Sequence, residues 1–149
     1  KIALIVILAI LIIIQFFPAS KNQSTELLAS DITKVTTVPD DVLQVLKAAC
    51  YDCHSNNTVY PWYNNIQPVA WWLNRHVEEG KEHLNFSTFG EYTSEKAAKK
   101  MRGIAREVEK GDMPLTSYTL IHRNAVLNET QKQAVINWTK SAVIASLAH

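Results

Sequence analysis

The sequence predicts an all-α protein with one apolar helix at its N-terminal end. Three observations support this prediction. Apolar residues recur at spacings of three and four in several separate segments, the period of a helix with one buried face. Residues that cap helices precede most of these segments. No alternating apolar and polar pattern long enough for a strand occurs in the 149 residues.

The first apolar segment covers residues 2–17, in which only Gln15 is polar. As a helix it would be about 24 Å long, slightly less than the ~30 Å hydrocarbon core of a bilayer. It is longer than the apolar part of a usual signal peptide, and no clean A-x-A cleavage site follows it. We therefore expect residues 1–19 to form a retained transmembrane signal anchor, with a cleaved signal peptide as the alternative. Lys1 would remain on the cytoplasmic side.

The next segment, residues 20–39, is polar, rich in Ser and Thr and without helical periodicity, which is typical of a tether. An alternative is that residues 32–38 pack on the domain as an ordered arm. Residues 40–149 are expected to form one helical domain, long enough to bury a hydrophobic core. Lys and Arg total 15 and Asp and Glu total 14, and no basic block occurs, so nucleic acid is not an expected partner.

The first two helices of the domain have recognisable ends. Asp40 can cap a helix whose apolar face runs to Cys50. Pro68 suits the first turn of a second helix, which carries one apolar stripe and ends near Gly80 or His83.

The last two helices carry clear capping signals. Thr93 or Ser94 can cap a third helix, and Gly111 suits the position just after its end. Asn128 opens the last helix, with Gln131 three residues later as a capping box. The connection between these helices is expected to be a loop.

The pentapeptide Cys50-Tyr51-Asp52-Cys53-His54 closes the first of these helices. Two cysteines at this spacing can each form a thioether with a vinyl group of haem, and the histidine is placed to ligate the iron. The chain has two cysteines in all, so no second pair completes a zinc site. A redox-active dithiol is the alternative, but it usually occurs in a βαβ context, which this sequence lacks. The pentapeptide therefore predicts one covalent haem c.

His54 is thus expected to be one axial ligand of the iron. Its other ring nitrogen should donate to a backbone carbonyl, for which the Tyr60–Pro68 loop is the candidate. For the second axial ligand we favour Met113, which lies in the predicted loop and is stiffened by the proline after it. His76 and His122 are the alternatives, although a buried histidine is more often a hydrogen-bonded core residue. A methionine that simply fills a core gap is also common.

Aromatic residues are dense around the motif, and haem, a large flat apolar ligand, needs such walls. We expect Tyr63 and Trp72 to contact it, and we take Trp62, Arg75 and Tyr118 as candidates to hydrogen-bond its propionates. An ordinary aromatic core would show the same composition.

Several motifs in a consistent order resemble the bacterial haem-binding-domain family of small cytochrome c-like proteins. The resemblance covers about residues 42–138 and is carried by the stretch 50–58, Tyr60-Pro61-Trp62-Tyr63, Gln67-Pro68-Val69, Leu84-Asn85-Phe86-Ser87, Met113-Pro114-Leu115, Tyr118 and His122. It implies a cytochrome c-like helical fold around one haem c. It also implies export, which with the anchor predicts a single-pass protein of a bacterial inner membrane whose haem domain lies on the periplasmic side.

An iron with two protein ligands has no open position, so transfer of single electrons is the expected function. The protein would then be a carrier and not an enzyme, working between redox protein partners of a respiratory chain or as a subunit of a larger respiratory complex. The alternative is a peroxidase-like enzyme or a gas sensor, which requires an open or labile sixth position.

Overall fold

The computed structural model describes the backbone of residues 1–24 and 26–147 and the side chains of 1–24 and 26–143. The all-α prediction is confirmed, because the described residues form helices and short 3-10 turns and no strand. A single isolated bridge joins Gln23 and Asn57. Residues 148 and 149, which belong to the predicted domain, lie outside the described part.

The expected transmembrane anchor is wrong. Helix α1 covers Ile2–Ile13 and passes into a 3-10 turn, η1, at Ile14–Phe16. Twelve residues of α-helix are about 18 Å long, well below the ~30 Å that a bilayer core requires. Among the described residues, no helix combines the length and apolarity needed to cross a membrane. The single-pass inner-membrane location, which depended on this helix, is corrected with it.

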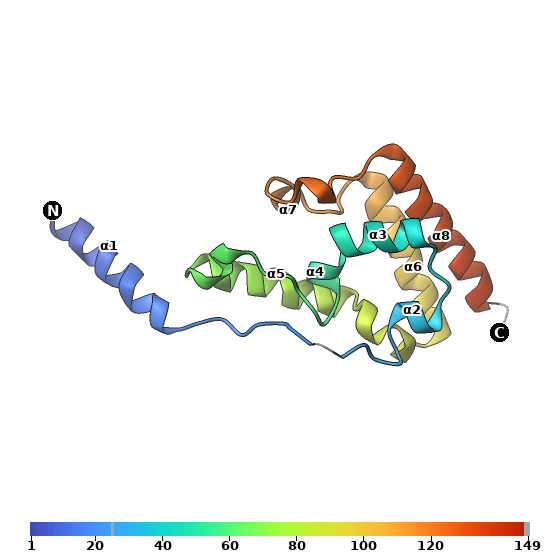
Figure 1. The fold of residues 1–149 in the computed structure, drawn as a ribbon, viewed down its shortest axis with the longest axis horizontal. Coiled ribbons are helices and arrows are strands. Elements are labelled where there is room, and N and C mark those ends of the chain that lie inside the picture. Colours follow the sequence, from blue (N-terminus) through green and yellow to red (C-terminus); the bar gives the residue numbers. More distant parts are fainter. Residues whose placement is uncertain (25, 148–149) are drawn as a thin grey trace.

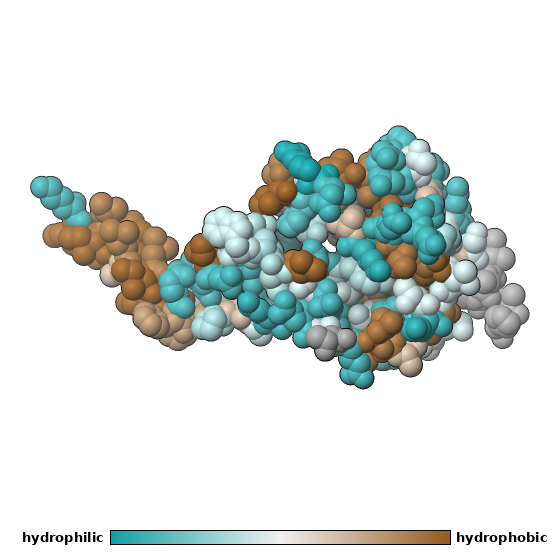
Figure 2. Space-filling view, in the orientation of Figure 1, coloured by the Kyte–Doolittle hydropathy of each residue, from teal (hydrophilic) through white to brown (hydrophobic). Residues whose placement is uncertain are grey.

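The apolar N-terminal helix nevertheless lies apart from the rest of the molecule (Figure 1). None of its residues is buried, and Figure 2 shows it as a continuous hydrophobic surface. The helical run of α1 and η1 stops before Phe17, because Pro18 disfavours the helical conformation of the residue before it. Gln15 fixes the end of the turn by donating to the carbonyl of Gln67 at 3.1 Å.

The core of the domain is built from three helices: α3 at Asp40–Ala49, α6 at Ser94–Lys110 and α8 at Glu129–Leu147. α6 and α8 lie side by side, and α3 packs across α8 (Figure 1). The buried faces interlock through Leu46 of α3, Met101 of α6 and Val135 of α8, which expose 2% of their surface or less. The apolar stripes of the sequence thus face one another as their period predicts.

The predicted helix ends agree with the structure at most positions. Thr93 caps α6 by accepting from the backbone N–H of Lys96, and Gly111 ends it with φ 77°. Asn128 and Gln131 form the capping box of α8, with bonds of 2.9 and 3.0 Å. At α3 the helix starts one residue earlier than predicted, so Asp40 lies inside the first turn, where its charge favours the helix dipole.

The remaining elements connect this core and form one side of the molecule. Helix α5 is the longest of them, at Val69–His83. The others are short: α2 at Ile32–Val35, α4 at Tyr51–His54, η2 at Trp62–Asn65, η3 at Phe86–Glu91, α7 at Thr116–Thr119 and η4 at Arg123–Ala125.

Two parts of the segment 20–39 pack on the domain, one at Asn22 and one at α2, which lies within the ordered arm of residues 32–38 given above as an alternative. Asn22 accepts from the N–H of Thr58 at 2.9 Å through its carbonyl, and its side-chain amide donates to the carbonyl of Ser55 at 2.8 Å. Further along, Asp31 caps α2 by accepting from the N–H of Thr33, and Ile32 is fully buried against η3.

Phe86 joins this arm and the core to the cysteine motif. Its ring is 1% exposed, stacks on Tyr51 with a centroid distance of 5.2 Å and meets the edge of His54 at 6.3 Å. We predict that Phe86→Ala lowers the free energy of unfolding by about 3–5 kcal/mol, because the substitution removes these ring contacts and leaves a cavity in their place. Urea denaturation of the purified protein measures this change. Leu27→Ala, at a side chain that is 61% exposed, should change it by less than about 0.5 kcal/mol.

Candidate functional site

The cysteine motif forms one tight helical turn. α3 ends at Ala49, and Cys50 breaks the helix with φ −127° and ψ −40° before α4 begins. The carbonyl of Cys50 then accepts from the N–H groups of Cys53 at 3.2 Å and His54 at 2.9 Å. Both thiols and the imidazole are thus carried by five consecutive residues of one turn.

The ring of His54 is held from behind by α5. Its Nδ1 lies 2.8 Å from the carbonyl oxygen of Gly80 and 3.1 Å from that of Leu84. Carbonyl oxygens only accept, so Nδ1 carries the proton and Nε2 is left with a free lone pair. Burial lowers the pKa of His54, which favours the neutral ring that a metal requires. The acceptor was expected in the Tyr60–Pro68 loop, and the structure places it instead at the carboxyl end of α5.

Gly80 permits this contact. A Cβ built on Gly80 would lie 2.6 Å from the carbonyl oxygen of Cys53, closer than real side chains approach backbone. α5 can therefore rest directly on the cysteine turn only because this residue has no side chain.

Both cysteines are free thiols in a poorly solvated turn. Burial, with a smaller contribution from Cys53, raises the pKa of Cys50 to about 12. Burial and then the charge of Asp52 raise the pKa of Cys53 to about 11. Redox-active dithiols need a lowered thiol pKa, so this environment disfavours the dithiol alternative.

A cavity of about 290 Å³ opens beside the motif, between α5 and the segment that includes α7. This volume is close to the lower end of the ~300–1,000 Å³ range typical of ligand pockets. Its walls are mainly apolar and aromatic, and Cys53 forms part of them. The lining consists of Asp52, Cys53, Thr58, Val59, Tyr60, Pro61, Tyr63, Val69, Trp72, Leu73, His76, Val77, Leu115, Ser117, Tyr118, Ile121 and His122.

The predicted site residues divide into two groups. Cys53, Tyr63, Trp72 and Tyr118 line the cavity, as do both alternative histidines. The others do not line it, but Cys50 and His54 lie in the same turn as Cys53. Trp62, Arg75 and Met113 lie neither in the lining nor in this turn.

These three residues have other surroundings. Trp62 is 76% exposed and meets the edge of Tyr63. Met113 is half-buried, and its N–H donates to the carbonyl of Glu107 at the end of α6. Their roles at the haem stay predictions.

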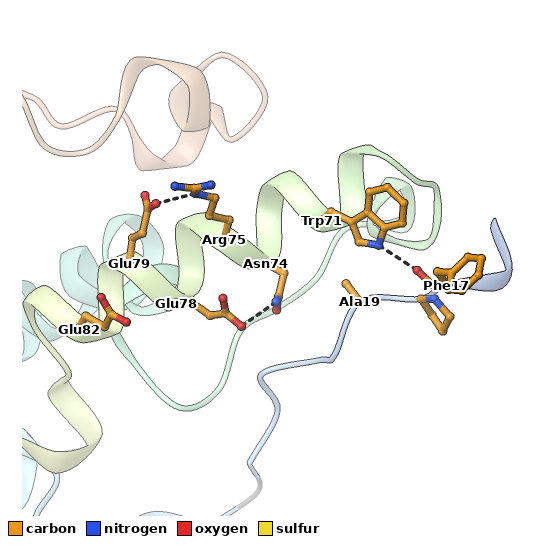
Figure 3. Close-up of a pocket in the computed structure, with 9 residues that line it drawn as sticks. Phe17, Ala19, Trp71, Asn74, Arg75, Glu78, Glu79 and Glu82 are labelled. Carbon is orange, nitrogen blue, oxygen red and sulfur yellow. Dashed lines mark hydrogen bonds and ion pairs between the residues drawn. The ribbon is translucent and has the colours of Figure 1, made fainter. Parts of the chain in front are cut away.

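Arg75 faces a separate, open hollow between α5 and the N-terminal segment (Figure 3). There it pairs with Glu79 at 2.8 Å, while Asn74 donates to Glu78 at 2.9 Å. Trp71 closes one end by donating from Nε1 to the carbonyl of Phe17. The propionate role of Arg75 also stays a prediction.

Asp52 is a site residue that the sequence did not reveal. One of its carboxylate oxygens accepts from the N–H of Val59 at 3.0 Å, and the other from the hydroxyl of Tyr118 at 2.7 Å. The carboxylate thus ties the cysteine turn to the wall carrying α7. Asp52 and Tyr118 are 66 residues apart, and no local pattern signals such a contact.

The residues present fit a haem, because thiols, an anchored neutral imidazole and an apolar cavity occur together. The fold and the site define a helical haem-binding protein. The comparison with known families agrees: residues 9–141 match the haem-binding domain family, and the chain belongs to it. Among curated proteins and among solved structures, nothing matched the chain.

A comparison of two glycine variants tests the contact between α5 and the cysteine turn. Gly80→Ala should destabilise the protein by about 1–3 kcal/mol and lower its haem content, since a Cβ would push α5 from the motif. Gly103→Ala is the matched control, because a Cβ there meets nothing within 4 Å. It should stabilise the protein by about 0.5–1 kcal/mol. Equal effects of the two substitutions in thermal unfolding would contradict the importance of this contact.

Proposed function

We propose that the protein carries one haem c, bound covalently through Cys50 and Cys53, with His54 as an axial ligand. Each thiol would add across one vinyl group, forming a carbon–sulfur bond while its proton moves to carbon, so no oxidant is consumed. The observation that carries the proposal is the placement of His54. It lies in the same helical turn as both thiols, and its ring is fixed by the carbonyls of Gly80 and Leu84. Donation from the other ring nitrogen to a carbonyl orients a metal-bound imidazole and raises its basicity.

We further propose that the protein transfers single electrons between redox proteins. When bound, the iron supplies a one-electron couple between its ferric and ferrous states. The chain would contribute a ligand held by two hydrogen bonds and an apolar cavity lined by Leu73 and Val77 of α5. A second protein ligand on the iron would then favour electron transfer over reaction with a bound substrate.

Exposed apolar residues in the cavity lining support a role for protein partners. Val59 and Ile121 line the cavity and are 74% and 62% exposed. Apolar surface left exposed beside a site can serve as a contact for another protein. A partner that docks there would lie close to the cofactor.

Covalent attachment has a direct test. The chain produced in a host with cytochrome c maturation should carry the mass of one haem after acid–acetone extraction. Cys50→Ser or Cys53→Ser should each leave a single thioether, and the double variant should lose haem to the extract. A bare polypeptide mass for the unmodified chain would refute the proposal.

Carbon monoxide distinguishes the carrier from an enzyme or sensor. We expect the reduced protein to bind it slowly or not at all, because a second protein ligand occupies the iron. A redox titration followed in the visible spectrum should fit one reversible one-electron step. Rapid binding of carbon monoxide by the unmodified protein would favour an open sixth position and count against the carrier.

A further inference from the structure

We propose that His122 is the second axial ligand of the iron, binding through Nε2 on the face opposite His54. This inference rests on the haem binding proposed above and adds the identity of the sixth ligand. It makes the site bis-histidine, whereas the sequence alone favoured a methionine.

The orientation of His54 restricts where the second ligand lies. Its Nδ1 faces the carbonyls of Gly80 and Leu84 at the carboxyl end of α5. The two nitrogens of an imidazole point in roughly opposite directions, so Nε2 faces away from α5. Iron bound to Nε2 would lie on that far side, and a second protein ligand would have to come from beyond it. His76 belongs to α5, one turn before Gly80, and is therefore unfavourably placed.

His122 comes from the opposite wall, just after α7. It lines the cavity together with Cys53 and is half-buried. Its Nδ1 lies 3.1 Å from the carbonyl oxygen of Tyr118, which leaves Nε2 available as in His54. Metal-binding histidines usually donate their other ring nitrogen in this way.

The position of His122 is tied to the cysteine turn. Its ring stacks on that of Tyr118, with a centroid distance of 4.1 Å and an interplanar angle of 13°. The hydroxyl of Tyr118 donates at 2.7 Å to Asp52, which lies between the two cysteines. The contacts from His122 to Tyr118 and from Tyr118 to Asp52 therefore fix the position of the His122 ring relative to the two cysteines. Tyr118 acts as a positioning residue.

Met113 lacks these connections. It lies outside the cavity lining, and its backbone is bonded to the end of α6. Two imidazoles stabilise ferric iron relative to an imidazole and a thioether, so the reduction potential should be lower than for a histidine–methionine haem c.

The test compares His122→Gln with His76→Gln in the full chain loaded with haem. His76 is a matched control, because it lines the same cavity and its Nδ1 also bonds the carbonyl four residues earlier, at 2.8 Å. We expect the ferric His122→Gln protein to lose its low-spin electron paramagnetic resonance signal and to regain one on addition of imidazole. The His76→Gln spectrum should match that of the unmodified protein.

A second variant and the unmodified protein keep the inference testable if His122→Gln does not fold. His122→Met should remain low-spin, gain the weak red-edge band of sulfur ligation and show a raised potential. That band in the unmodified protein would overturn the inference in favour of Met113. A low-spin signal that survives in His122→Gln would overturn it as well, and the band and the His76→Gln spectrum would then distinguish Met113 from His76. Loss of the signal in His76→Gln alone would overturn it in favour of His76. Absence of covalent haem from the unmodified chain would instead refute the proposed function.

Discussion

His54 and the carboxyl end of α5 are joined by hydrogen bonds of 2.8 and 3.1 Å, and the arrangement of the site follows from this junction. The bonds require α5 to rest on the backbone of Cys53, which in turn requires Gly80. Once α5 is in place, its apolar side forms one wall of the cavity. The direction of the His54 ring also decides on which side an iron could lie. The close contact between Gly80 and Cys53 thus positions the His54 ring and the α5 wall of the cavity.

The opposite wall has little regular structure of its own and is held by polar contacts. α7 is a single turn, and the chain around it packs less extensively than α6 against α8. The bond from Tyr118 to Asp52 anchors this wall to the cysteine turn. A hydrogen bond to a charged group contributes about 1.5–3 kcal/mol, enough to position a segment that buries little apolar surface. The two walls therefore depend on different forces, close packing on one side and a charged hydrogen bond on the other.

The sequence predicted what local patterns encode. Helix period, the capping box at Asn128 and the C-terminal glycine at Gly111 were confirmed, because each depends on neighbours a few residues away. The membrane anchor failed because hydropathy does not record where a helix ends, and the helix stops at Ile13. The Asp52–Tyr118 bond and the acceptors for His54 join distant residues, so only the folded chain reveals them.

The docked N-terminal segment also changes how the apolar helix α1 relates to the cavity. Residues 15–22 are fixed to the body at Gln67, Trp71 and Ser55, so α1 is mounted on the domain and does not hang from a flexible linker. A flexible linker would let a molecule held by α1 meet the cavity from many directions at a concentration set by linker length. A fixed attachment holds α1 at one orientation and one distance from the cavity. A molecule that contacted α1 would therefore meet the cavity from a restricted set of directions.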